Sequence, residues 1–277
     1  MAAQTIELVG KIGSMALIRQ EDKDINYNIF SRLGADLKPG MVWVSSGATE
    51  IGRLDYMKRN DGQELAGDEE EIKADYAAQG QAILMENYRR FISPEYSVRQ
   101  LLVEHTHFND LDKCSHIRNL LLRCTGQGAI PIINYNDPVS FEENRKMELS
   151  SLRQNRDSVV ECIDNDETAA VIATLVKAKR LLIMTSVEGI YLDPADPSTL
   201  VERITGSDAE AVVAEIKRLQ EHCEGASRRG AGGAKAKLEY CIEPVRAGTE
   251  VIIGHARHRI MDLVEGRVKC TRIGVNL

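Results

Sequence analysis

A loop rich in glycine and lysine lies near the carboxyl end of the chain and contains the residue types that bind phosphate groups. Residues 230–237 read Gly-Ala-Gly-Gly-Ala-Lys-Ala-Lys and lead into a stretch expected to be helical. Glycine leaves backbone N–H groups free to approach a polyanion, the following helix adds its positive N-terminal end, and lysines add charges suited to phosphate oxygens. The GxxxxGK[ST] spacing of a Walker A motif is absent, so this is either another kind of phosphate loop or a solvated surface loop.

A second lysine–glycine element closes the first apolar run of the chain. Lys11, Gly13 and Ser14 stand at the end of residues 6–12. Taken alone, this pattern also fits a surface lysine beside a tight turn. Two such elements at opposite ends of the chain predict a nucleotide that is bound from two sides.

An acidic turn and an amide-rich turn offer further polar groups. Asp164-Asn165-Asp166-Glu167 fits a turn that organises a metal or the lysines, and it also fits a helix N-cap with acids in the first turn. The two interpretations are compatible, because Asp164 can cap the helix while Asp166 orders the lysines. Residues 134–138, Asn-Tyr-Asn-Asp-Pro, supply amides and a carboxylate, although these residue types are also common in plain turns.

Other chemistries have less support. His105 and His107 would share one face of a strand, but no third ligand lies at a recognised spacing, which favours a surface or interface role over metal binding. The sequence contains no GxSxG motif and no evident Ser/His/Asp arrangement. We therefore predict neither a protein-bound metal site nor a covalent nucleophile.

Composition indicates a globular protein with a sizeable core. Of 277 residues, 43% are hydrophobic and 28% charged, which fits one large α/β domain or two smaller ones. The net charge of −7 argues against a nucleic-acid partner, which usually requires a basic face. No apolar run approaches the roughly 20 residues of a membrane helix, and no secretory signal is evident. Six scattered cysteines without CxxC spacing favour free thiols, so we expect a cytoplasmic protein with no membrane partner.

Apolar runs that fit buried strands alternate with amphipathic stretches that fit helices, which predicts a mostly parallel sheet covered on both faces. The expected strands are 6–12, 42–45, 98–103, 130–134, 180–185 and 249–253, and the expected helices are 24–34, 48–59, 71–91, 112–126, 166–178, 208–222 and 234–247. Ligands of such sheets bind beyond the carboxyl ends of the strands, where several polar turns would converge. Two polar segments interrupt the alternation. We expect a surface loop at 60–71 and a hairpin arm or mobile lid at 140–156.

The order of these pieces resembles the amino-acid kinase family, and within it most the glutamate 5-kinases. The matching motifs are Lys-Ile-Gly-Ser at 11–14, Ser-Ser-Gly-Ala at 45–48, Ala-Ala-Gln-Gly-Gln at 77–81, the Pro-x-x-Asn-x-Asn-Asp strand end at 131–137, Asp-Asn-Asp at 164–166, a Thr…Gly-x-Tyr…Asp-Pro segment at 185–194 and the glycine–lysine loop at 230–237. Several motifs in the same order across nearly the whole chain are far more specific than any one of them.

The resemblance implies a three-layer αβα sandwich with a mostly parallel, eight-stranded sheet. Residues 1–277 would form one domain, with the acceptor bound by about 1–165 and the nucleotide by about 166–277, and without the RNA-binding-like C-terminal domain of many glutamate 5-kinases. The implied reaction is ATP-dependent phosphorylation of a carboxylate, most directly L-glutamate to L-glutamyl 5-phosphate, the first step of proline biosynthesis. The implied cofactors are ATP and Mg²⁺, the partner is a small-molecule substrate, and the expected assembly is a homo-oligomer, a dimer or a tetramer.

The resemblance also assigns roles to individual residues. Lys11 and Lys237 would neutralise charge on the transferring phosphoryl group, and Asp166 would orient both lysines. The acceptor would be held by Ser46, Gly47, Asn134, Asp137 and Asn165. The nucleotide would be bound by Lys11, Gly13, Ser14, Thr185, Ser186, Gly230, Ala231, Gly232, Gly233 and Lys237.

Two departures from the family pattern leave alternatives open. Residues 140–156 lengthen the interval between Asp137 and Asp164, beside the acceptor residues. The acceptor could therefore be another amino acid, a phosphonate or a nucleoside monophosphate. Ser186 stands where the family usually has an aspartate, which leaves open a nucleotide-binding regulatory or storage protein without turnover.

Overall fold

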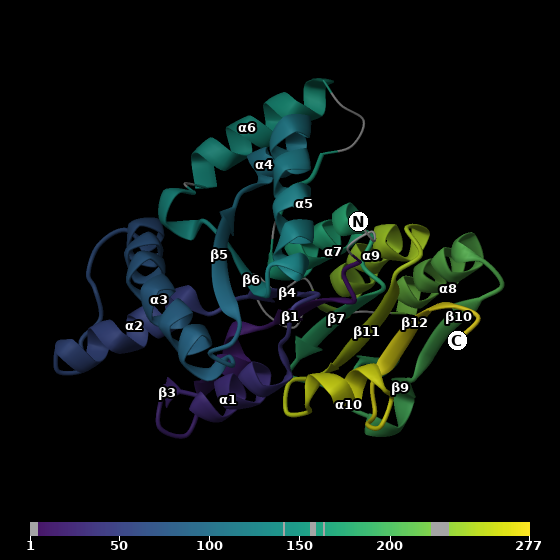
Figure 1. Ribbon diagram of the computed structural model, residues 1–277, viewed down its shortest axis with the longest axis horizontal. Coiled ribbons are helices and arrows are strands. Elements are labelled where there is room, and N and C mark those ends of the chain that lie inside the picture. The colour runs from purple at the N-terminus through teal and green to yellow at the C-terminus, as the bar shows by residue number, and fades with distance from the viewer. Residues whose placement is uncertain (1–4, 141, 156–158, 163, 223–232) are drawn as a thin grey trace.

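An eight-stranded sheet forms the middle layer of the molecule (Figure 1). The computed structural model describes residues 5–140, 142–155, 159–162, 164–222 and 233–277. In sheet order the strands are β10 (Arg203–Gly206), β12 (Thr271–Val275), β11 (Glu250–His255), β7 (Arg180–Thr185), β1 (Leu8–Ile12), β4 (Met41–Ser45), β6 (Ala129–Tyr135) and β5 (Ser97–Val103). The pairing of β11 with β12 is antiparallel and the other pairings are parallel, so β10 and β12 run against the rest of the sheet.

Helices cover both faces of this sheet. One face carries α5 (Leu111–Gly126), α7 (Asn165–Val176), α8 (Ala209–His222) and α9 (Gly233–Arg246). The opposite face carries α1 (Tyr27–Asp36), α2 (Ala48–Arg59), α3 (Glu69–Phe91) and α10 (Ile260–Val264). The described chain also contains α4 (His105–Asn109), α6 (Glu142–Asn155), the small strand pairs β2–β3 (Ile18–Arg19, Asp24–Ile25) and β8–β9 (Ile190–Tyr191, Leu200–Val201), and the 3-10 helices Ser14–Leu17, Asp137–Val139 and Pro197–Thr199. The predicted three-layer αβα sandwich with a mostly parallel sheet is confirmed.

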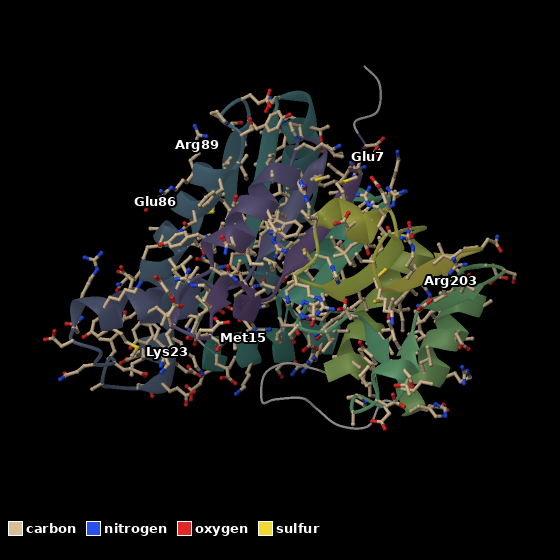
Figure 2. The ribbon with its side chains drawn as sticks, turned by 90° about the horizontal axis from the view of Figure 1, so that it is seen from below. Glu7, Met15, Lys23, Glu86, Arg89 and Arg203 are labelled. Atoms are coloured by element: carbon tan, nitrogen blue, oxygen red, sulfur yellow. The ribbon has the colours of Figure 1, made fainter. Side chains whose placement is uncertain are left out.

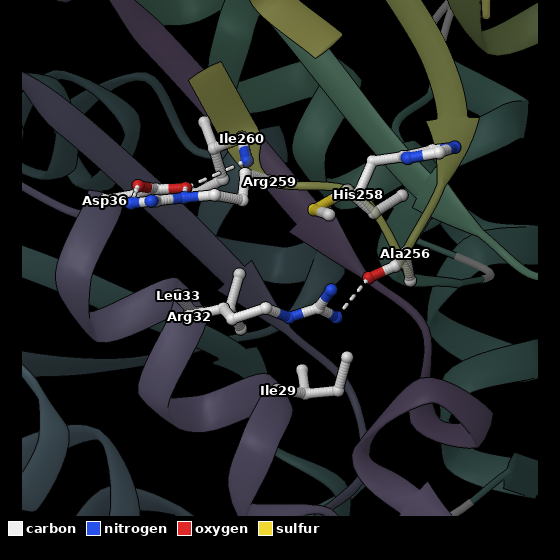
Figure 3. Close-up of a pocket in the computed structure, with 9 residues that line it drawn as sticks. Ile29, Arg32, Leu33, Asp36, Ala256, His258, Arg259 and Ile260 are labelled. Carbon is white, nitrogen blue, oxygen red and sulfur yellow. Dashed lines mark hydrogen bonds and ion pairs between the residues drawn. The ribbon is translucent and has the colours of Figure 1, made fainter. Parts of the chain in front are cut away.

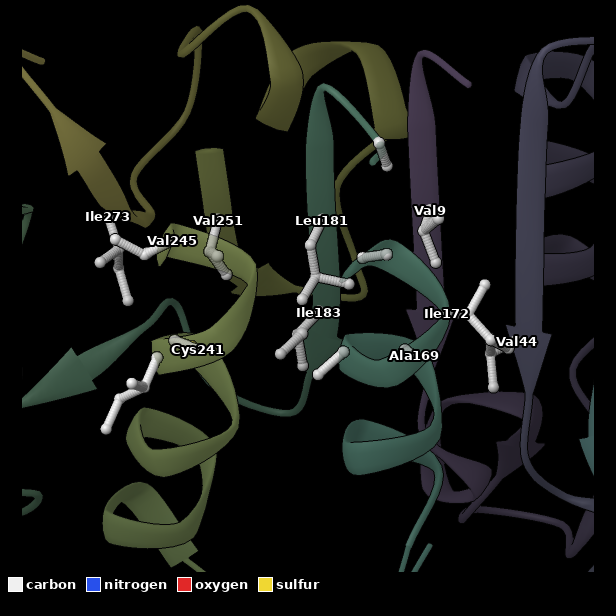
Figure 4. Close-up of a cluster of buried hydrophobic side chains, with 14 of the residues drawn as sticks. Val9, Val44, Ala169, Ile172, Leu181, Ile183, Cys241, Val245, Val251 and Ile273 are labelled. Carbon is white, nitrogen blue, oxygen red and sulfur yellow. The ribbon is translucent and has the colours of Figure 1, made fainter. Parts of the chain in front are cut away.

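The central strands β7, β1 and β4 are largely apolar, and most of their residues on both faces are buried. In β7, Leu181 faces the cluster that includes α7 and α9, and Leu182 faces the opposite cluster. The same alternation holds for Val9 and Leu8 in β1. Figure 4 shows the first cluster, in which side chains of α7 and α9 meet those of the central strands. Continuous apolar strands of this kind are typical of parallel sheets covered by helices.

Local sequence signals explain where several helices begin. Asp68 caps α3 by accepting hydrogen bonds from the backbone N–H groups of Glu70 and Glu71, and Asp110 caps α5 in the same way. Acidic residues fill the first turn of α3, and Arg89 and Arg90 occupy its last turn, as the helix dipole favours. Figure 2 shows Glu86 and Arg89 pointing outward from this helix.

Glycines allow α2 and α3 to pack with their backbones in direct contact. A Cβ atom on Gly52 would lie 1.8 Å from the carbonyl oxygen of Tyr76, and a Cβ on Gly80 would lie 1.8 Å from that of Ala48. No side chain fits in this space. The 77–81 element is therefore held close to the start of α2, beside the end of β4.

The structure corrects parts of the sequence-based description. Residues 140–156 were expected to form a hairpin arm or a lid, but 142–155 form the helix α6, so the hairpin is wrong. This helix is polar almost all round, with Leu149 as a buried residue, and so it lacks the apolar stripe that identifies amphipathic helices. The strands β10 and β12 were not predicted at all.

Candidate functional site

The carboxyl ends of β7, β1, β4 and β6 meet at one edge of the sheet, because these strands are neighbours. The ends of these strands and the turns that follow them contain the predicted site residues Lys11, Gly13, Ser14, Ser46, Gly47, Asn134, Asp137, Thr185 and Ser186. Backbone hydrogen bonds join adjacent strand exits: Gly13 N donates to Met184 O at 3.4 Å, and Ser46 N donates to Ile12 O at 3.2 Å. The expected convergence of polar turns at this edge is thus present in the structure.

Lys11, Lys237 and Asp166 form one ion-pair cluster. Lys11 Nζ lies 2.7 Å from Asp166 Oδ1, and Lys237 Nζ lies 2.8 Å from Asp166 Oδ2. The Asp166 side chain is 3% exposed, whereas those of the lysines are 12% and 19% exposed. Two ammonium groups on one carboxylate leave a net positive charge, and the exposure of the lysines leaves that charge accessible to an anion.

The electrostatics of Asp166 depend on both lysines. Burial disfavours the charged carboxylate, but Lys11 and Lys237 outweigh this penalty and hold the pKa of Asp166 below its ordinary value. Asp166 also lies in the first turn of α7, where the helix dipole favours negative charge. Asp166 is therefore a carboxylate near neutral pH.

Asp164 positions this turn. Its side chain accepts hydrogen bonds from Asp166 N at 2.8 Å and Glu167 N at 3.0 Å, so it is the N-cap of α7. Burial raises the pKa of Asp164, and the neighbouring Asp166 charge adds to this shift. The two interpretations of the acidic turn therefore hold together: Asp164 caps the helix and Asp166 contacts the lysines.

A row of amide side chains lies next to this cluster. Asn165 Nδ2 donates to Ser46 Oγ at 2.9 Å and to Asn134 Oδ1 at 3.1 Å, and Asn134 Nδ2 donates to Gln81 Oε1 at 2.9 Å. Gln81 was not among the predicted site residues, although it is the last residue of the 77–81 motif. Asn165 Oδ1 and Gln81 Nε2 are buried and have no hydrogen-bond partner among the described residues. Buried polar atoms are rarely left unpaired, so this row is suited to a polar ligand.

Gly47 and Asp137 flank the row of amides. Gly47 has φ of 104°, a left-handed conformation that favours glycine, and it begins the turn into α2. Asp137 opens the 3-10 helix that follows β6. Burial raises the pKa of Asp137 to about 6, although the positive charge of Arg145 opposes this shift. A carboxylate in such surroundings is stabilised by a cationic ligand.

The other predicted nucleotide residues stand at the ends of strands and helices. Gly13 precedes the 3-10 helix that begins at Ser14, Thr185 ends β7 with Ser186 exposed after it, and Gly233 begins α9. Gly230, Ala231 and Gly232, which were predicted to bind the nucleotide as well, lie outside the described residues.

Hydrogen bonds from α1 to the turn after β11, and from that turn to Thr185, hold the end of β7 in place (Figure 3). Arg32 Nη2 donates to Ala256 O at 2.9 Å, and Ala256 N donates to Thr185 O at 2.8 Å. Asp36 accepts from Ile260 N at 3.0 Å and pairs with Arg259. These contacts fill the cleft between α1 and α10 and leave no room for a small molecule there.

His105 and His107 lie in helix α4 and not on the strand that the sequence suggested, and each contacts a neighbouring protein group. His105 Nε2 pairs with Glu148 at 2.9 Å, and His107 Nδ1 accepts from Glu104 N at 2.8 Å. Within the described part of the chain, no group of three or more His, Cys, Asp or Glu residues could hold a metal ion. No helix in that part is both long and apolar enough to cross a membrane.

The αβα fold and the cluster of Lys11, Asp166 and Lys237 match the amino-acid kinase resemblance seen in the sequence. Comparison with known proteins agrees. The model of the amino acid kinase family matches residues 8–255, so the chain belongs to that family. It is 29% identical over 269 residues to the glutamate 5-kinase of Dehalococcoides mccartyi, a match that covers 96% of this chain and 65% of that protein. The chain thus spans somewhat less than two thirds of this relative's length. The glutamate 5-kinase of Alkaliphilus metalliredigens is 29% identical over 275 residues, covering 96% of this chain and 94% of the relative.

A solved structure shows the same fold. The carbamate kinase from Giardia lamblia bound to AMP-PNP superimposes with a TM-score of 0.61 at 15% identity, covering 99% of this chain and 100% of that one.

Proposed function

We propose that this protein is a kinase that transfers the γ-phosphoryl group of ATP to the carboxylate of a small molecule. The most direct acceptor is L-glutamate, which would give L-glutamyl 5-phosphate and ADP, the first step of proline biosynthesis. The observation that carries the proposal is the placement of Lys11 and Lys237 on the two oxygens of the buried Asp166. The names of the relatives support glutamate as the acceptor.

The proposed reaction needs positioned charge and little else from the protein. A carboxylate oxygen of the acceptor attacks the γ-phosphorus, and the bond from this phosphorus to the β–γ bridging oxygen breaks as ADP leaves. The acceptor is already deprotonated near pH 7, so no general base is required. Phosphoryl transfer is accelerated mainly by positioning and by preorganised positive charge. Lys11 and Lys237 supply that charge, and Asp166 keeps both ammonium groups in place.

The remaining residues divide between the two substrates. Ser46, Gly47, Asn134, Asp137 and Asn165 would bind the acceptor, with Gln81 orienting Asn134. Gly13, Ser14, Thr185, Ser186 and the loop that ends at Gly233 would bind the nucleotide. Mg²⁺ would enter with ATP and offset part of the phosphate charge with few protein ligands, which fits a site whose central carboxylate is already paired with two lysines. We further propose that the protein acts as a cytoplasmic homo-oligomer.

A coupled assay tests the function. ADP production is measured with MgATP and a panel of carboxylic acids, and hydroxylamine is present to trap an acyl phosphate as its hydroxamate. We expect saturable ADP release and hydroxamate with glutamate. ADP release that does not depend on any added acid, or no release with every acid tested, would contradict the proposal.

A second acceptor class has one specific observation in its favour. Helix α6 occupies the interval between Asp137 and Asp164, next to the proposed acceptor residues. Another amino acid, a phosphonate or a nucleoside monophosphate would then be phosphorylated in place of glutamate. Saturable activity in the same panel with such an acceptor, and none with glutamate, would select this alternative. Calorimetric binding of ATP without any phosphoryl transfer would select a regulatory or storage role.

A further inference from the structure

Helix α6 presents an arginine to the acceptor side of the site. The Arg145 guanidinium lies over the ring of Tyr135, 5.4 Å from its centroid, and Nη2 donates to the backbone oxygen of Glu161 at 2.7 Å. Tyr135 directly follows Asn134 in β6, and Asp137 lies two residues further on. Arg145 is half-buried between the strand end and the segment that leads into α7.

The position of this arginine is fixed by the rest of the helix. Glu148 Oε2, one turn further along α6, lies 2.9 Å from Nε2 of the buried His105, and His105 also contacts the Tyr135 hydroxyl at 3.2 Å. Leu149 of the same helix is buried. The segment of α6 that carries Arg145 is therefore fixed by Glu148 and Leu149, independently of the contacts of the guanidinium.

The charge of Arg145 has no anionic partner in an ion pair among the described residues. Lys146 pairs with Glu142 at 2.5 Å, and Arg153 pairs with Glu161, but no carboxylate in the described ranges forms an ion pair with Arg145. Its Nε atom is buried and lacks a hydrogen-bond partner among the same residues. A partly buried guanidinium with an unused donor is suited to a planar anion, which it can bind through two parallel hydrogen bonds.

Asp137 supplies the complementary charge close by. It is near enough to Arg145 for the arginine to offset part of the effect of burial on its carboxylate, yet the two do not form an ion pair. A cationic group and an anionic group of one ligand would satisfy both side chains. The α-ammonium and α-carboxylate of an amino acid have this arrangement, whereas a phosphate dianion would be repelled by Asp137.

We propose that Arg145 is a specificity-determining residue that binds the α-carboxylate of an amino-acid acceptor, while Asp137 binds its α-ammonium group. This rests on the proposed kinase function and deepens it. With its head group held between α6 and the end of β6, an acidic amino acid would direct its side-chain carboxylate toward Lys11 and Lys237. The substrate class is thus an amino acid with a second, side-chain carboxylate.

The test compares glutamate with two analogues that each lack one head group. 4-Aminobutyrate lacks the α-carboxylate, and glutarate lacks the ammonium group. Steady-state kinetics are measured for the wild type, Arg145→Gln, Arg145→Lys and the matched control Lys146→Gln, which removes the neighbouring charge of the same helix. Circular dichroism and the calorimetric affinity for MgATP establish that each variant is folded.

We expect Arg145→Gln to raise the KM for glutamate on the order of 10- to 100-fold, as loss of a charged hydrogen-bonded pair does, with kcat within about threefold. The KM for 4-aminobutyrate should be unchanged, Arg145→Lys should recover part of the loss, and Lys146→Gln should behave as the wild type. Equal effects of Arg145→Gln on both substrates, or equal effects of the two glutamine variants, would overturn the proposal.

Failure of the function and failure of the inference are separable by calorimetry with glutamate alone. If the wild type shows no turnover but binds glutamate, and Arg145→Gln does not bind it, phosphoryl transfer is refuted and the role of Arg145 stands. If the wild type does not bind glutamate at all, the role of Arg145 is refuted as well.

Discussion

Lys11 Nζ lies 2.7 Å from Asp166 Oδ1, although the two residues come from the first strand of the sheet and from a helix in the second half of the chain. The other oxygen of the same carboxylate contacts Lys237. Asp166 therefore fixes the separation of two cations that originate far apart in sequence. Without it, the two ammonium groups would repel each other, and the positive charge would not be preorganised for a polyanion.

The two lysines should contribute to one and the same step. We predict that Lys237→Ala lowers kcat on the order of 10²-fold or more, because transition-state charge loses one stabilising group. Lys11→Ala should have a similar effect, and the double variant should lose less than the product of the two, because both groups act on one phosphoryl group. The measurement is the initial rate of ADP formation at saturating substrates. Lys235→Ala, in the same helix but exposed, is the control, and a Lys237→Ala enzyme with unaltered kcat would remove Lys237 from the mechanism.

Replacing the Asp166 carboxylate should leave the repulsion between Lys11 and Lys237 uncompensated. We predict that Asp166→Asn lowers the free energy of unfolding by about 3 kcal/mol, because loss of one partner leaves partly buried charges uncompensated. The folded-state pKa of Asp166 is lowered, so its stabilisation is present above the unfolded pKa and is lost only as pH falls through the folded pKa. The difference between variant and wild type in urea denaturation should therefore be constant from about pH 5 to about pH 8.

Binding of a polyanion tests whether charge repulsion causes the destabilisation of Asp166→Asn. Triphosphate, a polyanion, should raise the melting temperature of Asp166→Asn by more than it raises that of the wild type, since it replaces the missing negative charge. Equal shifts would show that the destabilisation has another origin.

The sequence was sufficient to predict the strands and the edge of the sheet that hold the site, and the reason is physical. Strands such as β7 are buried on both faces and are therefore apolar between their ends, and a parallel arrangement brings their polar exits together. β10 and β12 escaped detection because Arg203–Gly206 and Thr271–Val275 mix charged or small residues with one or two large apolar ones. Helix α6 escaped because its contacts are Glu148 with His105 and Arg145 with Tyr135, which no periodicity reveals.

The sequence predicted where the candidate site lies better than it predicted the contacts within the site. The motif at 77–81 was recognised, but nothing in the sequence indicates that Gln81 bonds Asn134 across two elements. That contact depends on the close packing of α2 and α3, which only the structure reveals.

Ionised Asp137 should lower the stability of the folded protein while it contributes to acceptor binding. Its pKa rises from an ordinary value of 3.8 to about 6 in the folded state, so the folded protein takes up a proton between these values and wild-type stability falls as pH increases through this window. We predict that Asp137→Asn is more stable than the wild type at about pH 8 by about 1–3 kcal/mol and equally stable near about pH 4. Chemical denaturation at the two pH values measures this, with Asp75→Asn, at an exposed position of α3, as the control.

The same ionisation should appear in catalysis. If Asp137 binds a cationic group of the acceptor, the KM for glutamate should rise as pH falls below about 6, while the KM for ATP should not. A KM for glutamate that is independent of pH between about 5 and about 8 would count against a charged Asp137 in the complex.

The close packing of α2 and α3 connects the stability of the fold to acceptor binding. In an ordinary exposed helix, Gly→Ala is stabilising by about 1 kcal/mol. At Gly80 the new methyl group would lie 1.8 Å from the carbonyl oxygen of Ala48, a backbone atom that cannot move without displacing α2. We therefore predict that Gly80→Ala destabilises the protein by about 2–3 kcal/mol, as overpacking does, whereas Glu86→Ala on the outer face of α3 changes stability by less than about 0.5 kcal/mol.

Because Gln81 follows Gly80 and bonds Asn134, the displaced helix should also raise the KM for glutamate, while calorimetric affinity for MgATP stays as in the wild type. A Gly80→Ala protein of wild-type stability and KM would mean that α2 and α3 can separate freely, and that the row from Gln81 to Asn165 is not held in place by their contact.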